Sequence, residues 1–257
     1  MDFKLINLLH LEWQPVGLFY VDEKPDDALT MKAGKKNCVA DVLMAAARGK
    51  KIVIDDETCG CAGGATGVGF GDAFDRRHHC YRYLLSGGIN DVPAGEEVKL
   101  PPHMIEGERF FESPEVVQMW KDSLPFGPFE QKSVVFAPAN RWDAEEKPKL
   151  VVLFVNPDQL SALVSMGGYR TGSAFETIAP FGAACQQIVY ALNQCGKENP
   201  KMVIGFFDIS QRGRIPANVL TLTMPYEKFE QLEEDADKGC LSSHSWVELM
   251  KTRGITE

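Results

Sequence analysis

The run LVVLFV at residues 150–155 constrains the fold of this chain more than any other segment. Six consecutive apolar residues, half of them valine, are typical of a strand that is buried on both faces of a sheet. Asn156 and Pro157 follow directly, and an asparagine cap with proline at the first helical position predicts a helix after the strand. A buried strand that leads into a helix indicates an α/β or α+β protein.

Apolar periodicity and turn residues predict strands and helices along the whole chain. Helices are expected where apolar residues recur every three or four positions, and strands where short apolar runs lie between turn residues. Residues 59–71 are expected to form a glycine-rich loop after a strand. The expected strands span residues 16–21, 51–54, 133–136, 150–155, 175–178, 202–208 and 219–224, and the expected helices span residues 39–48, 73–85, 114–124, 157–166, 182–195, 226–236 and 245–251.

These elements predict a single domain over residues 1–257, with a mixed β-sheet flanked by helices. A glycine-bearing turn leads to a cysteine at residues 57–61 and again at residues 180–185. One interpretation is a duplicated αβ unit, with similar halves at residues 1–130 and 131–257. The other is a coincidence between two common strand-to-helix turns.

The composition indicates which binding partners and which cellular compartment to expect for this protein. The chain has 27 basic and 36 acidic residues, a formal net charge of -9, which disfavours nucleic acid and anionic membrane as partners. We expect no signal peptide, because residues 1–10 lack a basic start followed by a long apolar stretch, and no apolar segment approaches the length of a membrane span. Seven cysteines, an odd number in a long chain, favour free thiols and a cytoplasmic location over a secreted disulfide framework.

The first candidate site follows the strand at residues 51–54. Cys59 and Cys61 are followed by a glycine run that includes Gly63, Gly64 and Gly67. Glycines let a backbone approach a bound group closely, and cysteine thiolates bind zinc or iron–sulfur clusters or carry out redox steps. The structural alternative is that the two cysteines are small residues in a tight turn.

Two histidines and a third cysteine follow within the next twenty residues. His78, His79 and Cys80 add imidazole and thiolate groups of the kind that zinc accepts. However, the single residue between Cys59 and Cys61 points their side chains apart on an extended chain, unlike the usual zinc spacing. The histidines are interpreted as residues on a solvated helix face.

Cys185 is the second candidate. It lies near the expected start of the helix at residues 182–195, where the helix dipole would lower its pKa and favour the thiolate. The alternative is a small buried residue on an apolar helix. Cys38, Cys195 and Cys240 have no supporting neighbours and are interpreted as structural.

A cationic loop is the third candidate. Arg212 and Arg214 flank a glycine directly after an expected strand, where α/β folds place ligands. Arginine binds carboxylate or phosphate in a bidentate way, and Asp208 is expected to hold one arginine in place. The alternative is a solvated loop whose arginines pair with the acids of this chain.

The leading hypothesis brings these candidates together. Cys59, Cys185 and Cys61 converge near Arg212, where they bind zinc or an iron–sulfur cluster or present a redox thiol beside a small anionic ligand. The alternative is a non-catalytic module in which the glycines and arginines hold the anion and the cysteines only pack. A third is a scaffold or oligomer subunit without a ligand. The sequence leaves the reaction, the metal and the oligomeric state open.

Several of these segments together resemble the DUF169 family of uncharacterised bacterial and archaeal proteins. The resemblance spans most of the chain and implies a cytosolic prokaryotic protein without an assigned activity. It adds weight to Cys59, Cys185 and Arg212, which match the family pattern, whereas a cysteine at position 61 departs from it. The segments that carry it are Cys59 with its glycine run, residues 156–159 (NPDQ), residues 182–185 (GAAC), residues 207–212 (FDISQR) and residues 224–226 (MPY).

Overall fold

The computed structural model describes residues 3–32, 38–77, 80–100, 102, 105–126, 130–143 and 145–256. At its centre lies one eight-stranded mixed sheet with the order β2-β3-β4-β1-β5-β8-β7-β6. The expected mixed sheet flanked by helices is therefore confirmed, and the open sheet is consistent with an α+β fold. The strands are β1 (Val16–Val21), β2 (Leu29–Thr30), β3 (Ile52–Asp55), β4 (Ser133–Pro138), β5 (Leu150–Val155), β6 (Thr177–Ile178), β7 (Met202–Gly205) and β8 (Leu220–Pro225).

β5 lies in the middle of this sheet, between β1 and β8, as its apolar sequence requires. Leu150, Val152 and Phe154 pack into one hydrophobic core, whereas Val151 and Leu153 pack into a second core on the opposite face. Alternate residues of a strand point to opposite faces, so both faces must be covered to bury an unbroken apolar run.

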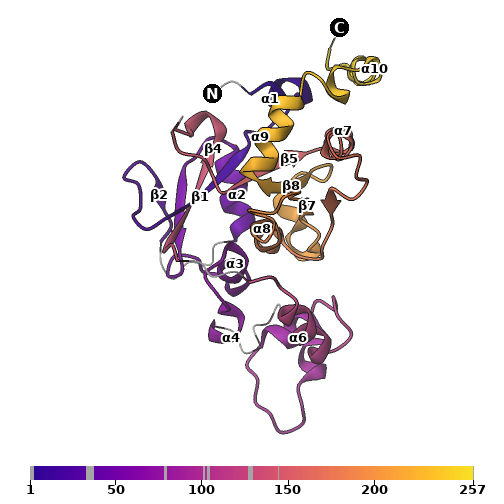
Figure 1. Ribbon diagram of the computed structural model, residues 1–257. Coiled ribbons are helices and arrows are strands. Elements are labelled where there is room, and N and C mark those ends of the chain that lie inside the picture. The colour runs from indigo at the N-terminus through magenta and orange to yellow at the C-terminus, as the bar shows by residue number, and fades with distance from the viewer. Residues whose placement is uncertain are drawn as a thin grey trace.

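Helices cover each face. The first core contains residues of α2, α3 and α8, and the second contains residues of α1, α7, α9 and α10, which lie toward the top of Figure 1 with both termini. Among the described residues, no helix is both long enough and apolar enough to cross a membrane. The helices named here are α1 (Lys4–Leu9), α2 (Val39–Ala47), α3 (Ala62–Val68), α7 (Pro157–Gly167), α8 (Ala184–Leu192), α9 (Tyr226–Asp235) and α10 (His244–Thr252).

The sheet consists of two similar halves about the central antiparallel pair β1–β5, in which Gly17 pairs with Val151. On one side follow β4, β3 and β2, with β2 parallel to β3 and α2 between them in the chain. On the other side follow β8, β7 and β6, with β6 parallel to β7 and α8 between them. The strand order therefore repeats on the two sides of the β1–β5 pair.

The correspondence between the halves differs from the expected one. Because β4 belongs to the first half, the division falls between β4 and β5, at residues 139–149, and not at residue 131. α8 corresponds to α2, so Cys185 near the start of α8 corresponds to Cys38 at the start of α2. The sequence had paired Cys185 with the segment at residues 57–61, because both contain glycine and cysteine.

Several other elements differ from the expected ones. The segment expected as a glycine-rich loop contains α3, a helix of seven residues that includes Gly63, Gly64 and Gly67. The single helix expected at residues 73–85 is two short helices, α4 (Ala73–Arg77) and α5 (Tyr81–Leu85). His78 and His79 lie outside the described residues. α1 and β2 were not expected, since each is too short to show a clear period.

A helical lobe extends from the sheet at the bottom of Figure 1 and contains α4 and α6 (Pro114–Asp122). Its interior is aromatic: the ring of Trp120 lies 6.0 Å from Phe74 and 6.0 Å from Phe181, which precedes α8. The buried ammonium of Lys121 pairs with Asp72 at 3.0 Å and also with Asp75, and thereby joins α6 to α4. These contacts anchor the lobe beside α3 and the start of α8.

Candidate cysteine site

Four of the seven cysteines lie on the α2, α3 and α8 side of the sheet. Cys38 occupies the N-cap position of α2 without a side-chain capping bond, the Cys61 side chain caps α3, and Cys185 lies in the first turn of α8. The pKa of Cys185 is raised well above its usual value, first by burial and then by the neighbouring thiols of Cys61, Cys38 and Cys59. Cys59, Cys61 and Cys38 thus lie close enough to Cys185 to influence its pKa, whereas shared binding of one ion by these thiols stays a prediction. We call these four residues the cysteine cluster.

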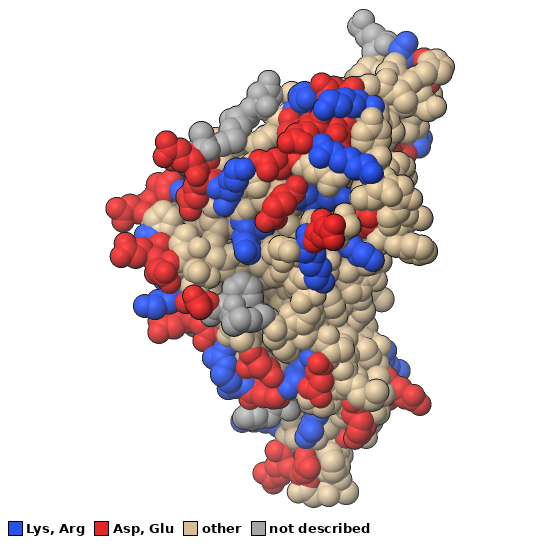
Figure 2. All heavy atoms as spheres, in the orientation of Figure 1, with Lys and Arg blue, Asp and Glu red and all other residues tan. Residues whose placement is uncertain are grey.

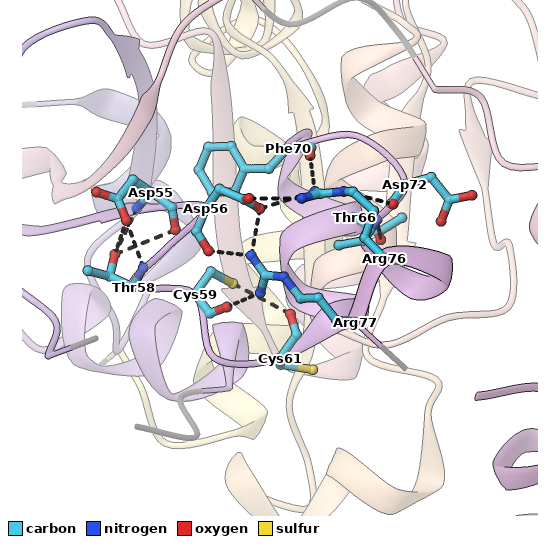
Figure 3. Close-up of polar contacts among 11 residues, drawn as sticks. Asp55, Asp56, Thr58, Cys59, Cys61, Thr66, Phe70, Asp72, Arg76 and Arg77 are labelled. Atoms are coloured by element: carbon cyan, nitrogen blue, oxygen red, sulfur yellow. Dashed lines mark hydrogen bonds and ion pairs between the residues drawn. The ribbon is translucent and has the colours of Figure 1, made fainter. Parts of the chain in front are cut away.

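A tight turn at the end of β3 positions Cys59. The carboxylate of Asp55 accepts a hydrogen bond from the backbone N–H of Thr58 at 2.7 Å, and the Thr58 hydroxyl accepts one from the Asp55 N–H at 2.9 Å (Figure 3). The Cys59 N–H then donates to the Asp55 carbonyl at 2.9 Å. Only 2% of Cys59 is exposed, and burial raises the pKa of its thiol to about 12. Cys59 is therefore a protonated thiol at neutral pH.

Cys61 is the exposed member of the cluster. Its sulfur accepts a hydrogen bond from the backbone N–H of Gly64 at 3.4 Å, which caps the first turn of α3. In Figure 3 the sulfurs of Cys59 and Cys61 point in different directions, as their spacing predicts. Within the described part of the chain, no three or more histidine, cysteine, aspartate or glutamate side chains are grouped so as to hold a metal ion.

The glycines of α3 allow it to pack closely against α8. A Cβ added at Gly67 would lie 2.5 Å from the backbone carbonyl carbon and oxygen of Cys185, closer than real atoms approach. A Cβ at Gly64 would lie 3.1 Å from the sulfur of Cys59. Gly64 and Gly67 are therefore needed where the helix meets the cysteine cluster, a role that the expected loop did not include.

The expectation that the helix dipole lowers the pKa of Cys185 is wrong. Its position near the start of α8 is as predicted, but only 6% of the residue is exposed, and burial raises the pKa instead. Removing a thiolate from water costs more than the partial charge of a helix end returns. Cys185 is thus a buried thiol and not an activated nucleophile in this conformation.

The arginines of the cationic loop bind acceptors of the chain itself. Arg212 donates to the backbone carbonyls of Val219 at 2.8 Å and Ala217 at 2.9 Å. Arg214 donates to Gln211 at 2.7 Å and to the carboxylate of Asp41 in α2. Each guanidinium therefore helps to fold the loop or to attach it to α2.

Asp208 does not hold an arginine, contrary to expectation. Its carboxylate accepts hydrogen bonds from the Ser210 N–H at 2.9 Å and the Ser210 hydroxyl at 2.6 Å, and caps the short 3-10 helix η4 (Ile209–Arg214). The arginine close to the cluster is Arg214 and not Arg212: its pKa is raised chiefly by Asp41, and also by Cys38 and Cys61.

Cys38, Gln211 and Arg77 belong to the site but were not predicted as functional. Cys38 had been interpreted as structural, yet its thiol donates to the amide oxygen of Gln211 at 3.3 Å, which also accepts from Arg214. Arg77 donates to the carbonyl of Cys59 and to Asp56. The position of Cys38 in the sequence could have indicated its role. Cys38 directly precedes the apolar residues of a helix, and Cys185 lies at a similar position near the start of another helix.

An open hollow of about 750 Å³ lies at the other end of α3. Gly69, Phe70 and Gly71 line it together with Asp56 and Arg76, whose guanidinium makes two hydrogen bonds to the Asp56 carboxylate, at 3.0 and 3.2 Å. No residue of the cysteine cluster is among those that line it. A small ligand in this hollow would therefore not touch the thiols.

Comparison with known proteins gives the family but no activity. The fold and the cluster define an α+β protein with free thiols at or near the N-terminal ends of α2, α3 and α8. The sequence model of DUF169, described as an uncharacterised ArCR family, matches residues 4–235, so the chain belongs to the DUF169 family, and the resemblance seen in the sequence is confirmed. No curated protein and no solved structure matches the chain.

Proposed function

We propose that this DUF169 protein binds a soft metal centre, a zinc ion or an iron–sulfur cluster, through thiolates of the cysteine cluster. The observation that carries the proposal is that the thiols of Cys38, Cys59 and Cys61, at or just before the starts of α2 and α3, are close enough to raise the pKa of Cys185 at the start of α8. Four thiols are the ligand set of structural zinc sites and of common iron–sulfur clusters. The seven free thiols suit a reducing compartment, and we place the protein in the prokaryotic cytoplasm.

The anion-binding module has less support. Arg212 and Arg214 donate to carbonyls, to Gln211 and to Asp41, so a bound anion would have to displace acceptors of the chain itself. On the face shown in Figure 2, basic side chains are interspersed with acidic ones, without a broad positive area of the kind that nucleic acid requires. A redox thiol is the other alternative, and Cys61 would be its reactive group because it is the exposed member of the cluster.

Metal content tests the proposal directly. Protein purified without oxygen is expected to contain stoichiometric zinc, or iron with a broad visible absorbance, by elemental analysis and spectroscopy. Cys61→Ser should lose most of this metal because it removes one thiolate ligand. Cys240→Ser is the matched control, since the Cys240 thiol donates to the Ala162 carbonyl on the opposite face of the sheet.

The outcomes separate the alternatives. Iron with a brown colour would indicate a cluster, and zinc alone would indicate a thiolate zinc site. Metal-free wild-type protein, or equal metal loss in Cys61→Ser and Cys240→Ser, would contradict the proposal. A metal-free protein with a bound small anion would favour the binding module.

The pKa values predict that metal binding releases protons. Burial raises the pKa of Cys59 to about 12 and that of Cys185 well above 9, so both are protonated at pH 7. Each must lose its proton to bind metal, so affinity should increase roughly tenfold per thiol for each pH unit, and weaken as pH falls. Titration of the metal-free protein with Cd²⁺ in weak buffer should release at least two protons per site. Binding without proton release would show that other groups are the ligands.

A further inference from the structure

The cysteine cluster is only partly accessible in this structure. Cys61 is exposed, but Cys59 is 2% and Cys185 6% exposed, and both lie against α3. A metal ion or reagent arriving from solvent therefore meets Cys61 first. It reaches the two buried thiols only if the structure around α3 opens.

The sequence of α3 (AGGATGV) makes it a weak helix. Three of its seven residues are glycine, and glycine is the least favourable helix former except proline. Seven residues are also too few for a helix to be stable without tertiary contacts. Its N-cap is the sulfur of Cys61, a weak acceptor, in place of the oxygen of Ser, Thr, Asp or Asn.

Packing does not require all three glycines of α3, as Gly63 shows. A Cβ at Gly63 would meet the Gln186 amide nitrogen and the Phe74 ring at 3.4 Å, an ordinary contact distance. Its φ is not positive, so alanine would be accommodated there and would strengthen the helix. Gly67, by contrast, is required by the backbone of Cys185.

The burial of Ala65 and Val68 in the first core and hydrogen bonds from neighbouring elements hold α3 closed. The Tyr20 hydroxyl donates to the Val68 carbonyl at 2.9 Å, and the Gln186 amide donates to the Gly63 carbonyl at 3.2 Å. The Thr66 hydroxyl accepts from the Ala73 N–H at 3.0 Å. Each is a bond between neutral groups, and such bonds contribute little net stability individually.

We propose that α3 is a gate, which unwinds locally while the sheet stays folded and so exposes Cys59 and Cys185. Low local stability is the property of segments that move to admit ligands. Opening would also free the backbone after Cys59, so that the thiols of Cys59 and Cys61 can turn toward one ion. This use of the gate for metal rests on the proposed function, whereas the opening itself does not.

Thiol labelling of the metal-free protein tests the gate independently of any metal. With N-ethylmaleimide and peptide mapping, Cys61 should react at once, and Cys185 at a slower rate set by the opening of α3. Gly63→Ala should slow the labelling of Cys185 about fivefold, the factor that corresponds to about 1 kcal/mol, and leave Cys61 unchanged. Gly213→Ala is the control, because a Cβ there meets nothing within 4 Å and lies outside α3.

A second variant and a reference rate complete the test. Tyr20→Phe removes the hydroxyl that donates to Val68 and should speed the labelling of Cys185. Amide exchange in β5, measured on the same samples, reports global unfolding. The proposal is overturned if Cys185 reacts only as fast as β5 exchanges, or if Gly63→Ala and Gly213→Ala give the same rate. A metal-free protein whose Cys185 still follows the predicted pattern would remove the proposed function and keep the gate.

Discussion

Replacing Gly67 with alanine is expected to lower the free energy of unfolding by about 2 to 3 kcal/mol, at the upper end of the overpacking range. The new Cβ would lie 2.5 Å from the carbonyl carbon and oxygen of Cys185 and 2.6 Å from its Cβ. Two of these atoms are backbone and cannot rotate away, so α3 must shift away from α8. The better helix propensity of alanine offsets only about 1 kcal/mol of this strain.

Gly63→Ala in the same helix is the matched control for this stability measurement. It makes the same chemical change four residues earlier, where the Cβ meets only side chains at 3.4 Å. It is expected to stabilise the protein by up to about 1 kcal/mol, so the two variants should differ in sign in urea denaturation. Equal stabilisation by both alanines would show that α3 and α8 do not pack closely at Gly67.

The sheet was predictable because local sequence and tertiary structure agree there. Residues 150–155 are apolar without interruption, and they lie in the centre of the sheet with both faces covered. The helix after them was equally clear, because Asn156, Pro157 and Gln159 form a capping box with proline at the first turn. Where the same residues favour a local structure and also fill the core, the sequence alone is sufficient to predict the element.

α3 was not predictable for the opposite reason. Its three glycines favour a loop locally, and only the close approach of α8 explains why a helix with glycine at positions 64 and 67 forms there. The prediction of a lowered pKa for Cys185 failed for a similar reason. The helix start was visible in the sequence, but the burial that raises the pKa comes from elements distant in the chain. The contact of Cys38 with Gln211, which lies 173 residues away, was likewise not visible in the local sequence.

Lys228→Met is expected to lower the free energy of unfolding by about 3 to 5 kcal/mol near neutral pH. The Lys228 ammonium is 1% exposed and donates to the Gly167 carbonyl at 2.8 Å and to the Glu176 carboxylate at 3.2 Å. Methionine keeps much of the volume but leaves Glu176, itself 6% exposed, as a buried charge without its partner. Urea denaturation at pH 7 measures the loss.

The double variant Lys228→Met/Glu176→Gln separates the charge from the packing. Glutamine retains an oxygen that can accept from the Thr171 hydroxyl, which donates to Glu176 at 3.1 Å, and removes the charge that methionine leaves unpaired. The double variant should therefore recover much of the stability lost in Lys228→Met, because removing both members of a buried pair costs less than removing one. If the double variant is as unstable as the single one, the loss comes from packing and not from charge.

The pH dependence gives the same prediction a second readout. Burial alone would raise the pKa of Glu176, but the hydrogen bond and charge of Lys228, with bonds from Ser173 and Thr171, outweigh it and lower the pKa below its usual 4.5. The carboxylate thus stabilises the wild-type fold above pH 4.5, and this contribution is lost as pH falls through the lowered value. Lys228→Met removes the largest contribution that lowers this pKa and leaves burial and the bonds from Ser173 and Thr171, so Glu176 should take up a proton at a higher pH than in the wild type. The stability difference between the two proteins should therefore be largest near pH 7 and shrink toward pH 4, whereas a pure packing defect would persist across that range.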